Sequence, residues 1–532
     1  MLKNYEKPIL RLILLIVNSM FCAVVCAGEL SLANPFGDHM VLQSNKPFPV
    51  WGKAKPKSKI TLLFAGHTVD GVADNNGNWL LRLPALDIQS KPQILTVKTD
   101  TKTVHINDVL VGEVWLCSGQ SNMDYKLGHL AKKNGKSKPL IREIANADFP
   151  LIRQLTEKKK LAPDKPATSV KCDWSVCTLE TVKDFTATGF FFARELHCDL
   201  NVPVGIIKAA WGGTPIEVWT RREVLLKTKV GRAYVLSKES ASKKFNAETA
   251  KAKVETWKKK NPDIKRTPSW VVRMGMDPRL TEHFPSTLYN GMIAPLIPFA
   301  IRGVIWYQGE DNARGYKAQN YRQAFVNMIQ DWRQQWGQEE LSFYFVQLPN
   351  YRKPVEVPGG SDWACLRESQ MVTLKVPNTG MAVTIDIGEE KDIHPSNKIE
   401  VGRRLALWAL AKDYGKDIVN SGPLYTQAIF KDGKAILTFR EVGSGLMVGK
   451  KRSIWDVVKK SNDSLKWFQI SGKDRKWFWA DARITGNNTV EVRAAQVMKP
   501  VAVRYAWADN PMGCNLYNKE GLPASPFRTD NW

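Results

Sequence analysis

Residues 113–124 read Glu113-Val-Trp-Leu-Cys-Ser-Gly-Gln-Ser121-Asn-Met-Asp124. Three apolar residues in succession predict a buried strand, and the glycine and polar residues after them predict a turn before a helix. In an open parallel sheet, ligands bind beyond the carboxyl ends of the strands, so Ser121 stands where a nucleophile would stand. The alternative is that Ser121 only caps the following helix, since serine is a favoured N-cap residue.

The turn differs from the usual nucleophile elbow, which reads Gly-x-Ser-x-Gly. Gly119 fits the first position of that motif, but Met123 occupies the last. This difference argues against the common α/β-hydrolase elbow and favours another serine-hydrolase fold.

The order of elements along the chain predicts three folded regions. Short strands separated by turn residues suggest a β-sandwich over 28–105, and similar strands return in a second β-sandwich region over 418–532. Between them, over 106–417, strands alternate with helices, which predicts an α/β fold with a parallel sheet and helices on both faces. The Lys-rich residues 221–263 are polar and predicted to be helical, and can form an insertion in this region.

The first residues have the pattern of a targeting segment. Lys3, Lys7 and Arg11 precede an apolar run, and Val25-Cys-Ala27 offers a cleavage site. We therefore predict a signal peptide over 1–27 and export of the chain to the periplasm or the extracellular surface. A retained signal anchor and a lipid-anchored Cys26 are the alternatives. No later apolar run reaches the ~20 residues of a membrane span, so we expect no stable membrane insertion.

Charge and cysteine content narrow the function. The chain of 532 residues has a formal net charge of +25, but its lysines are scattered rather than gathered into an aromatic-rich patch. This distribution predicts a solvated surface and no nucleic-acid partner, with a weak attraction for acidic sugars. Of the eight cysteines, Cys172 and Cys177 can close a local disulfide loop, and no spacing suggests a zinc site.

One of the seven histidines lies in a distinctive place. His394 belongs to the polar loop 386–395, which follows a predicted strand and precedes a predicted helix. Asp392, two residues earlier, can orient the imidazole as the acid of a catalytic triad does. The alternative is a loop histidine paired locally with an acid.

Two further strand ends offer donors for the oxyanion of an acyl-transfer reaction. Gly212 and Gly213 let the backbone approach a ligand closely, and Gln308 carries a side-chain amide. Each can instead be an ordinary turn residue. Four polar motifs at four predicted strand ends together favour a shared site.

These motifs resemble those of the sialate O-acetylesterase family, which belongs to the SGNH-hydrolase superfamily. The resemblance covers nearly the whole chain after residue 27. It rests on Gly119-Gln-Ser-Asn-Met123, Trp211-Gly-Gly-Thr-Pro-Ile-Glu217, Trp306-Tyr-Gln-Gly-Glu310 and Asp392-Ile-His-Pro395, and extends to residues 288–296 and 503–511.

The resemblance implies roles for particular residues. Ser121 would be the nucleophile, His394 the general base and Asp392 its orienting acid. The backbone amide of Ser121, Gly213 or Gly212, and the side chain of Gln308 would form the oxyanion hole. The fold would be SGNH-type, and no metal or cofactor is implied.

The sequence departs from the superfamily pattern at two places. Gln308 stands where many SGNH enzymes have Asn, and Asp-x-His is shorter than the usual Asp-x-x-His, whose register would place Lys391 at the acid position. Glu310 can therefore compete with Asp392 as the acid. Asn122 and Asn312, with Glu310, are the remaining candidates for contacts with a substrate.

The function that the resemblance implies is removal of O-acetyl groups from a carbohydrate, with O-acetylated sialic acid as the expected substrate. Two alternatives remain open: deacetylation of a plant polysaccharide such as xylan or xyloglucan, and a non-catalytic sugar-binding protein. The sequence does not set the oligomeric state.

Overall fold

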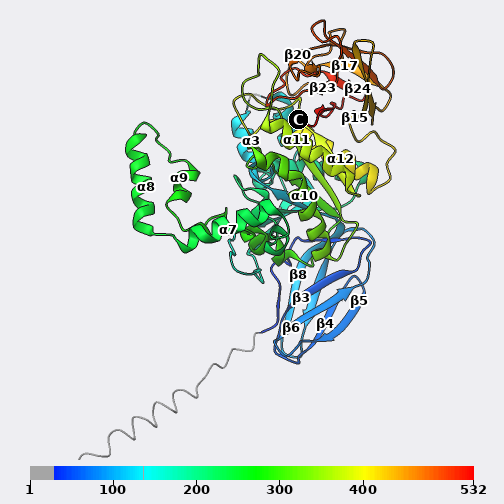
Figure 1. The fold of residues 1–532 in the computed structure, drawn as a ribbon. Coiled ribbons are helices and arrows are strands. Elements are labelled where there is room, and N and C mark those ends of the chain that lie inside the picture. Colours follow the sequence, from blue (N-terminus) through cyan, green and yellow to red (C-terminus); the bar gives the residue numbers. More distant parts are fainter. Residues whose placement is uncertain (1–28, 136) are drawn as a thin grey trace, which may run out of the picture.

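The structure is a computed structural model that describes residues 29–135 and 137–532 (Figure 1). The predicted signal peptide over 1–27, with Cys26 in it, lies outside the described residues. Of the helices within those described ranges, none combines the length and the apolar content that crossing a bilayer requires.

A large mixed sheet forms the centre of the molecule and confirms the α/β class. Its main path runs in the order β10-β9-β11-β8-β12-β13-β14. All neighbours on this path are parallel except β10, which pairs antiparallel with β9 at the edge. The strands are β8 (Thr103–Gly119), β9 (Phe149–Glu157), β10 (Cys172–Cys177), β11 (Val204–Ala210), β12 (Gly303–Tyr307), β13 (Ser342–Gln347) and β14 (Thr379–Val383).

Helices cover both faces of this sheet. Alternate side chains of a strand point to opposite faces, so neighbouring residues of one strand contact helices on different faces. On β13, Phe343 packs against Phe325 of α10, with ring centroids 5.8 Å apart. Tyr344, the next residue, points to the other face and lies 6.3 Å from Trp408 of α12. The helices around the sheet are α5 (Ala187–Leu200) and α12 (Lys398–Lys412), which pack on each other, and α10 (Tyr316–Trp336) and α11 (Asp362–Val372), which do the same.

The strand β8 continues beyond the central sheet into the N-terminal strands. Its first half pairs with β7 (Gln89–Lys98) and β2 (Val41–Gln43), and β4 (Lys59–Phe64) and β5 (His67–Val72) extend from β7. A second sheet holds β1 (Ser31–Leu32), β3 (Phe48–Lys53) and β6 (Asn78–Leu83). The predicted domain boundary at 105/106 falls inside β8, and the domain boundaries stay predictions.

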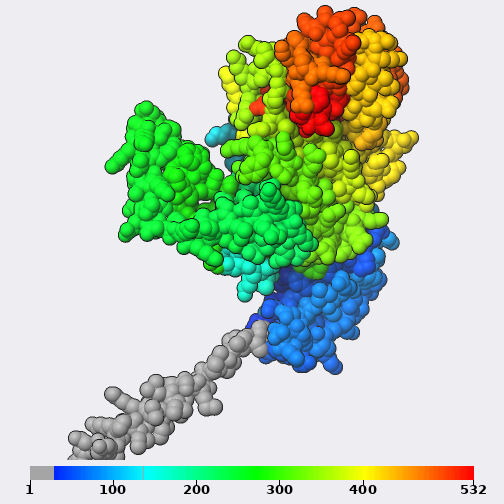
Figure 2. Space-filling model, viewed as in Figure 1, coloured from blue at the N-terminus to red at the C-terminus, as the bar shows by residue number. Residues whose placement is uncertain are grey.

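Strands also return after α12, at the opposite end of the body from the N-terminal strands (Figures 1 and 2). They form three antiparallel sheets, in the orders β15-β16-β22-β21, β18-β17-β24 and β20-β19-β23-β25. The strands are β15 (Leu424–Lys431), β16 (Lys434–Arg440), β17 (Leu446–Lys450), β18 (Lys459–Lys460), β19 (Phe468–Ser471), β20 (Trp477–Trp479), β21 (Asp481–Ile484), β22 (Thr489–Arg493), β23 (Ala502–Tyr505), β24 (Leu516–Asn518) and β25 (Phe527–Arg528).

Shorter elements connect this framework. The helices are α2 (Ser121–Asp124), α3 (Leu127–Lys133), α4 (Lys138–Ala145), α6 (Arg222–Leu225), α7 (Lys229–Lys243), α8 (Ala247–Lys260) and α9 (Ser269–Met274). The single turns are η1 (Val182–Asp184), η2 (Ile216–Val218), η3 (Pro278–Leu280), η4 (Tyr289–Ile293), η5 (Ala294–Leu296) and η6 (Thr373–Lys375). Helices α8 and α9 project from the body as an arm (Figure 2), in which Trp257 and Trp270 pack edge to face.

The local disulfide that the sequence allows between Cys172 and Cys177 does not form, and both cysteines are free. The two residues begin and end the single strand β10. At about 3.3 Å per residue the strand separates them by roughly 16 Å, far beyond the ~7 Å limit between the Cα atoms of a disulfide. Their thiols instead contact the carbonyl oxygens of Asn34 and Ala147.

The loop after β14 is held by a buried ion pair. Arg404 of α12 donates to both carboxylate oxygens of Asp386, at 2.6 and 2.9 Å, and both side chains are almost fully buried. Burial alone would raise the pKa of Asp386, but Arg404 and Lys451 outweigh it and hold the pKa far below its usual range. This pair fixes the start of the segment that leads to His394.

Replacing Arg404 with Ala should lower the free energy of unfolding by about 3–5 kcal/mol, because it leaves the buried Asp386 carboxylate without its main partner. The matched control is Arg403→Ala. Arg403 is the preceding residue and forms a more exposed pair with Glu400, so its loss should cost under about 1 kcal/mol. Urea unfolding followed by fluorescence measures both changes, and equal losses in the two variants would contradict the role of the buried pair.

Candidate active site

The turn after β8 brings Ser121 to the carboxyl edge of the sheet. Gly119, the last residue of β8, has a φ of +134°, and a Cβ there would lie 2.2 Å from the carbonyl oxygen of Tyr307. Only glycine fits this close approach of β8 to β12. Gln120 then donates its backbone N–H to Tyr307 at 2.9 Å, and Ser121 begins α2.

His394 meets Ser121 at this edge. His394 Nε2 lies 2.8 Å from Ser121 Oγ, a hydrogen-bonding distance. On the other side of the ring, His394 Nδ1 lies 3.5 Å from Asp392 Oδ1, which also accepts the backbone N–H of His394 at 2.7 Å. The side chains of His394 and Asp392 are 32% and 35% exposed, so a substrate can reach them. The structure thus brings together the three residues that the sequence predicts.

The surroundings favour the neutral imidazole. Burial lowers the pKa of His394, and the Lys398 ammonium lowers it further, while Asp392 partly opposes them. Burial would raise the pKa of Asp392, but Lys133 and the backbone N–H of His394 hold it below its usual range. A neutral histidine beside an ionised aspartate is the protonation state that a general base needs at neutral pH.

Two residues of the segment after Ser121 support this pair, and the sequence analysis did not identify them. Lys133 Nζ lies 2.8 Å from Asp392 Oδ2 and donates to the backbone carbonyl of His394 at 2.8 Å. The ring of Tyr125 stacks on the His394 ring, with centroids 5.6 Å apart. Both residues lie within 12 positions after Ser121, and this closeness in the sequence is the signal that could have identified them.

A buried polar network joins the Ser121 turn to the His394 loop through Asn122. Its Nδ2 donates to Ile393 O at 3.0 Å and to Glu310 Oε1 at 2.5 Å. Its Oδ1 accepts from Lys398 Nζ at 2.5 Å. Burial lowers the pKa of Lys398 to about 7 and raises the pKa of Glu310. Asn122 is therefore used within the fold, which differs from its predicted contact with a substrate.

The geometry favours Asp392 over Glu310 as the acid beside His394. In the described part of the chain, no hydrogen bond or ion pair joins Glu310 to His394. Glu310 is 5% exposed, and one of its carboxylate oxygens accepts from Asn122. Glu310 thus belongs to the network beneath the two loops.

Backbone amides near Ser121 are suited to an oxyanion. A Cβ on Gly212 would lie 3.1 Å from the Cβ of Ser121, so the end of β11 comes directly beside the serine. Within residues 29–135 and 137–532, no hydrogen bond uses the backbone N–H of Ser121, Gly212 or Gly213. Free backbone N–H groups at a nucleophile are the kind of donor that stabilises a tetrahedral oxyanion.

Gln308 differs from its predicted role as an oxyanion donor. Its Nε2 donates to Thr214 O at 3.1 Å and to Asn312 Oδ1 at 2.8 Å, which uses both amide hydrogens. Its Oε1 accepts from Tyr321 at 2.7 Å. The Gln308 side chain ties the ends of β11 and β12 to α10 and leaves no donor for a substrate.

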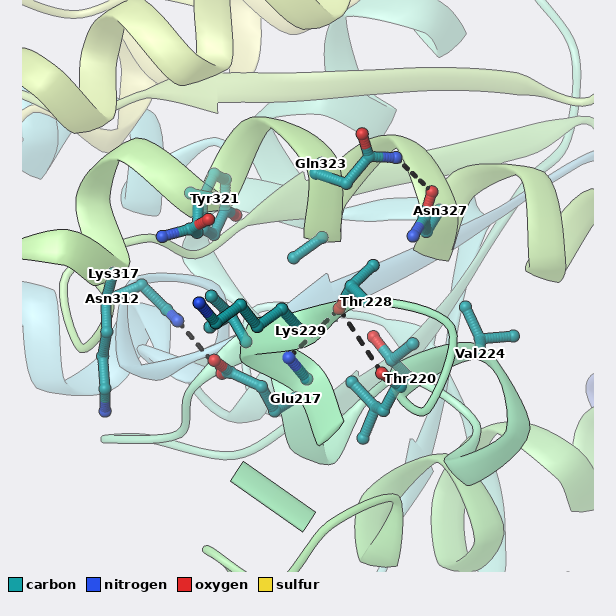
Figure 3. A pocket seen from close by; sticks show the side chains of 15 residues that line it. Glu217, Thr220, Val224, Thr228, Lys229, Asn312, Lys317, Tyr321, Gln323 and Asn327 are labelled. Carbon is teal, nitrogen blue, oxygen red and sulfur yellow. Dashed lines mark hydrogen bonds between the residues drawn. The ribbon is translucent and has the colours of Figure 1, made fainter. Parts of the chain in front are cut away.

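Asn312, predicted as a substrate contact, belongs to the same support in the structure. Its Oδ1 also accepts the backbone N–H of Ile216, and its Nδ2 donates to Glu217 at 3.0 Å. Behind this pair lies a cavity of about 90 Å³ that Lys317 and Tyr321 also line (Figure 3). It is much smaller than the ~300 Å³ of the smallest usual ligand sites, so it is no place for a sugar.

Most aromatic residues at these strand ends belong to the core. Trp115, Trp219, Trp306 and Tyr307 are fully buried. Trp211, which precedes Gly212, is partly exposed and lies 5.3 Å beneath the ammonium of Lys159. Trp211 is therefore the one member of this set that can present a ring to a ligand.

Comparison with known proteins gives concordant results. The family described as "carbohydrate esterase, sialic acid-specific acetylesterase" matches residues 111–247 and 269–411. Residues 248–268, which include most of α8, lie between the two matched segments.

Individual relatives extend the match over the whole length. A sialate O-acetylesterase of Mus musculus is 30% identical and covers 93% of each chain, and one of Homo sapiens is 28% identical over 93% of this chain and 91% of its own. The crystal structure of a carbohydrate acetylesterase from Xanthomonas citri is 37% identical with a TM-score of 0.77, covering 94% of this chain and 100% of that one.

Replacing Lys398 with Met should raise the pKa of His394, because the Lys398 charge disfavours the imidazolium. NMR titration of the histidine Cε1–H signals measures this pKa, and the His394 signal is identified by its loss in His394→Asn. Lys132→Met, which removes an exposed lysine of α3, is the control and should leave the pKa unchanged. A His394 pKa that is unchanged or lower in Lys398→Met would contradict the proposed electrostatics.

Proposed function

The chain belongs to the sialic acid-specific acetylesterase family of carbohydrate esterases, and on that premise we propose that it removes O-acetyl groups from sialic acid with Ser121 as nucleophile. It is a carboxylic ester hydrolase, as its relatives are. The observation that carries the proposed mechanism is the 2.8 Å contact between Ser121 Oγ and His394 Nε2. This contact pairs a hydroxyl with a neutral base at the open edge of the sheet.

The reaction proceeds in two acyl transfers. His394 Nε2 accepts the Ser121 proton as Oγ attacks the acetyl carbonyl carbon. The resulting oxyanion binds the backbone N–H groups of Ser121 and of Gly212 or Gly213. The tetrahedral intermediate collapses, the C–O bond to the sugar breaks, and His394 returns the proton to the departing sugar hydroxyl.

Water completes the cycle. His394 takes a proton from the water molecule that attacks acetyl-Ser121, the acetate leaves, and the proton returns to Ser121 Oγ. Asp392 orients the imidazole and stabilises the imidazolium that forms in each step. The 3.5 Å between Asp392 and His394 Nδ1 is longer than a strong hydrogen bond, as in many free enzymes, and closes when charge develops on the ring.

Sialic acid is the favoured sugar for two reasons. The matching family is described as sialic acid-specific, and the relatives from mouse and human are sialate O-acetylesterases. The net charge of +25 also favours an acidic sugar. Xylan and xyloglucan remain the competing substrates, because the similar structure from Xanthomonas citri is described as a carbohydrate acetylesterase without a named sugar.

Three finer features belong to the same proposal. The central sheet is of the SGNH type, and the N-terminal and C-terminal strands form β-sandwich regions around it. The chain is exported after cleavage near residue 27. The folded regions are 28–105, 106–417 and 418–532.

Replacing Ser121 with Ala should lower kcat on p-nitrophenyl acetate by on the order of 10⁴-fold or more, because it removes the nucleophile. Ser118→Ala is the matched control: Ser118 lies three residues earlier in β8, and its buried hydroxyl has no hydrogen-bond partner among the residues that the structure describes. It should keep nearly full activity. Undiminished turnover by Ser121→Ala would refute the nucleophile.

Acetate release should be fastest from 9-O-acetyl-N-acetylneuraminic acid. We expect kcat/KM on this monomer to exceed that on acetylated xylooligosaccharides by at least about 10-fold, the ratio that ~1.4 kcal/mol of transition-state binding gives. Enzymatic detection of acetate with both substrates measures the ratio. Faster release from the xylooligosaccharides would overturn the choice of sugar while leaving the serine mechanism intact.

A further inference from the structure

A second group of residues suited to carbohydrate lies on the C-terminal sheet β20-β19-β23-β25. Trp477 and Trp479 of β20 share one face of the sheet, because they are two positions apart. Trp467 packs edge to face on Trp479, with centroids 5.2 Å apart, and Trp532 lies 6.5 Å from Trp477. Trp479 and Trp532 are 37% and 38% exposed. Several neighbouring aromatic rings with exposed surface, unlike a single exposed ring, are typical of a binding surface.

The fold holds two of these rings rigidly. Trp467 Nε1 donates to Met512 O at 2.8 Å, and Trp479 Nε1 donates to Glu356 O at 2.9 Å. Because each indole N–H is bonded to the backbone, the rings keep their orientation and their apolar faces remain available.

The backbone at Trp467 is strained. Its φ is +67°, a left-handed conformation that is rare for a bulky side chain and costs about 1–3 kcal/mol. Such strain persists where the surroundings enforce it, and it is concentrated at binding sites. The strained residue, Trp467, carries one of the two rigidly held rings.

The two rings border a hollow of about 320 Å³. This volume lies within the range of small-molecule sites, about 300–1,000 Å³. Its lining combines apolar surface with two charged side chains, Glu356 and Lys466, neither of which forms an ion pair within the described residues. The lining residues are Val355, Glu356, Leu465, Lys466, Trp467, Phe468, Trp479 and Ala480. A sugar ring, with an apolar C–H face and polar hydroxyls, matches this combination.

One loop connects the hollow to the candidate active site. Residues 350–361 carry Glu356, whose carbonyl holds Trp479, and Arg352, whose N–H donates to Glu390 O at 2.9 Å. Tyr351 forms a bridge with Glu389. Glu389 and Glu390 belong to the same loop as Asp392 and His394. The loop that lines the hollow therefore also contacts the loop that carries His394.

We propose that the hollow between Trp467 and Trp479 binds a saccharide unit of the glycan whose acetyl group reaches Ser121. This inference rests on the proposed carbohydrate substrate and adds a subsite for the rest of the glycan chain. The subsite acts on the binding of extended substrates and leaves the chemistry at Ser121 untouched.

The test compares a short and an extended substrate. Trp479→Ala should lower kcat/KM on O-acetylated submaxillary mucin by roughly 10-fold or more, mainly through KM, because it removes a rigid aromatic contact. It should leave kcat/KM on free 9-O-acetyl-N-acetylneuraminic acid within about 2-fold of the unmodified enzyme. Trp270→Ala is the matched control, since Trp270 is 53% exposed on the distant arm. It should change neither value.

A second variant keeps both rings. Ala480→Arg fills the hollow and should produce the same loss on mucin. Equal kcat/KM on mucin for Ala480→Arg and the unmodified enzyme would overturn the subsite. The subsite would also be overturned if light scattering shows that the unmodified enzyme is a dimer and that Trp479→Ala is a monomer. In that case a second copy of the chain would occupy the surface.

Failure of the proposed function gives a different result. In that case the unmodified enzyme releases acetate from neither sialic acid substrate. Retardation of the Ser121→Ala chain in gels containing mucin or acetylated xylan then reports glycan binding without turnover. If the double variant Ser121→Ala/Trp479→Ala is no longer retarded, the result would support the subsite. Retardation that is unchanged in the double variant, or absent for Ser121→Ala in both gels, would overturn it.

Discussion

A single hydrogen bond of 2.8 Å joins Ser121 and His394 across 273 positions of the sequence, and the proposed chemistry depends on it. The serine follows β8 and the histidine lies beyond β14, with β12 and β13 between these two strands in the sheet. The loop that carries the histidine must therefore reach back across two strands. Buried contacts hold it there: Asp386 to Arg404 at its start, and Ile393 to Asn122 near its end.

Asn122 explains why a lysine and a glutamate are buried beneath this site. Its amide binds Lys398, Glu310 and the backbone of the His394 loop at once, so it ties the serine turn to the histidine loop. Burying charges rarely adds stability, but a buried hydrogen-bonded network can select one arrangement over its alternatives. Acyl transfer gains from this rigidity, because small displacements of a nucleophile from its base cost large factors in rate. Burial and the Lys398 charge both lower the pKa of His394 and so favour its neutral form.

The sequence predicted the features that local pattern determines. The alternation of strands and helices over 106–417 predicted a parallel sheet with helices on both faces, and the central sheet has this arrangement. Motifs at strand ends also located Ser121, Asp392 and His394. Features that depend on distant partners were not predictable: Gln308 is an amide at a strand end, but Thr214 and Tyr321 use all of its hydrogen-bonding groups. Cys172 and Cys177 are close enough in the sequence to suggest a closed loop. In the structure, the segment between them pairs with β9 as an extended strand, which keeps the two cysteines apart.

The most direct test of the Ser121–His394 pair is mass spectrometry of the protein after reaction with a fluorophosphonate, which labels a serine that a neighbouring base activates. One adduct should form, on the peptide that contains Ser121, in parallel with loss of esterase activity. His394→Asn should prevent labelling. An adduct on another residue that accompanies inactivation, or full labelling of Ser121 in His394→Asn, would contradict the pairing.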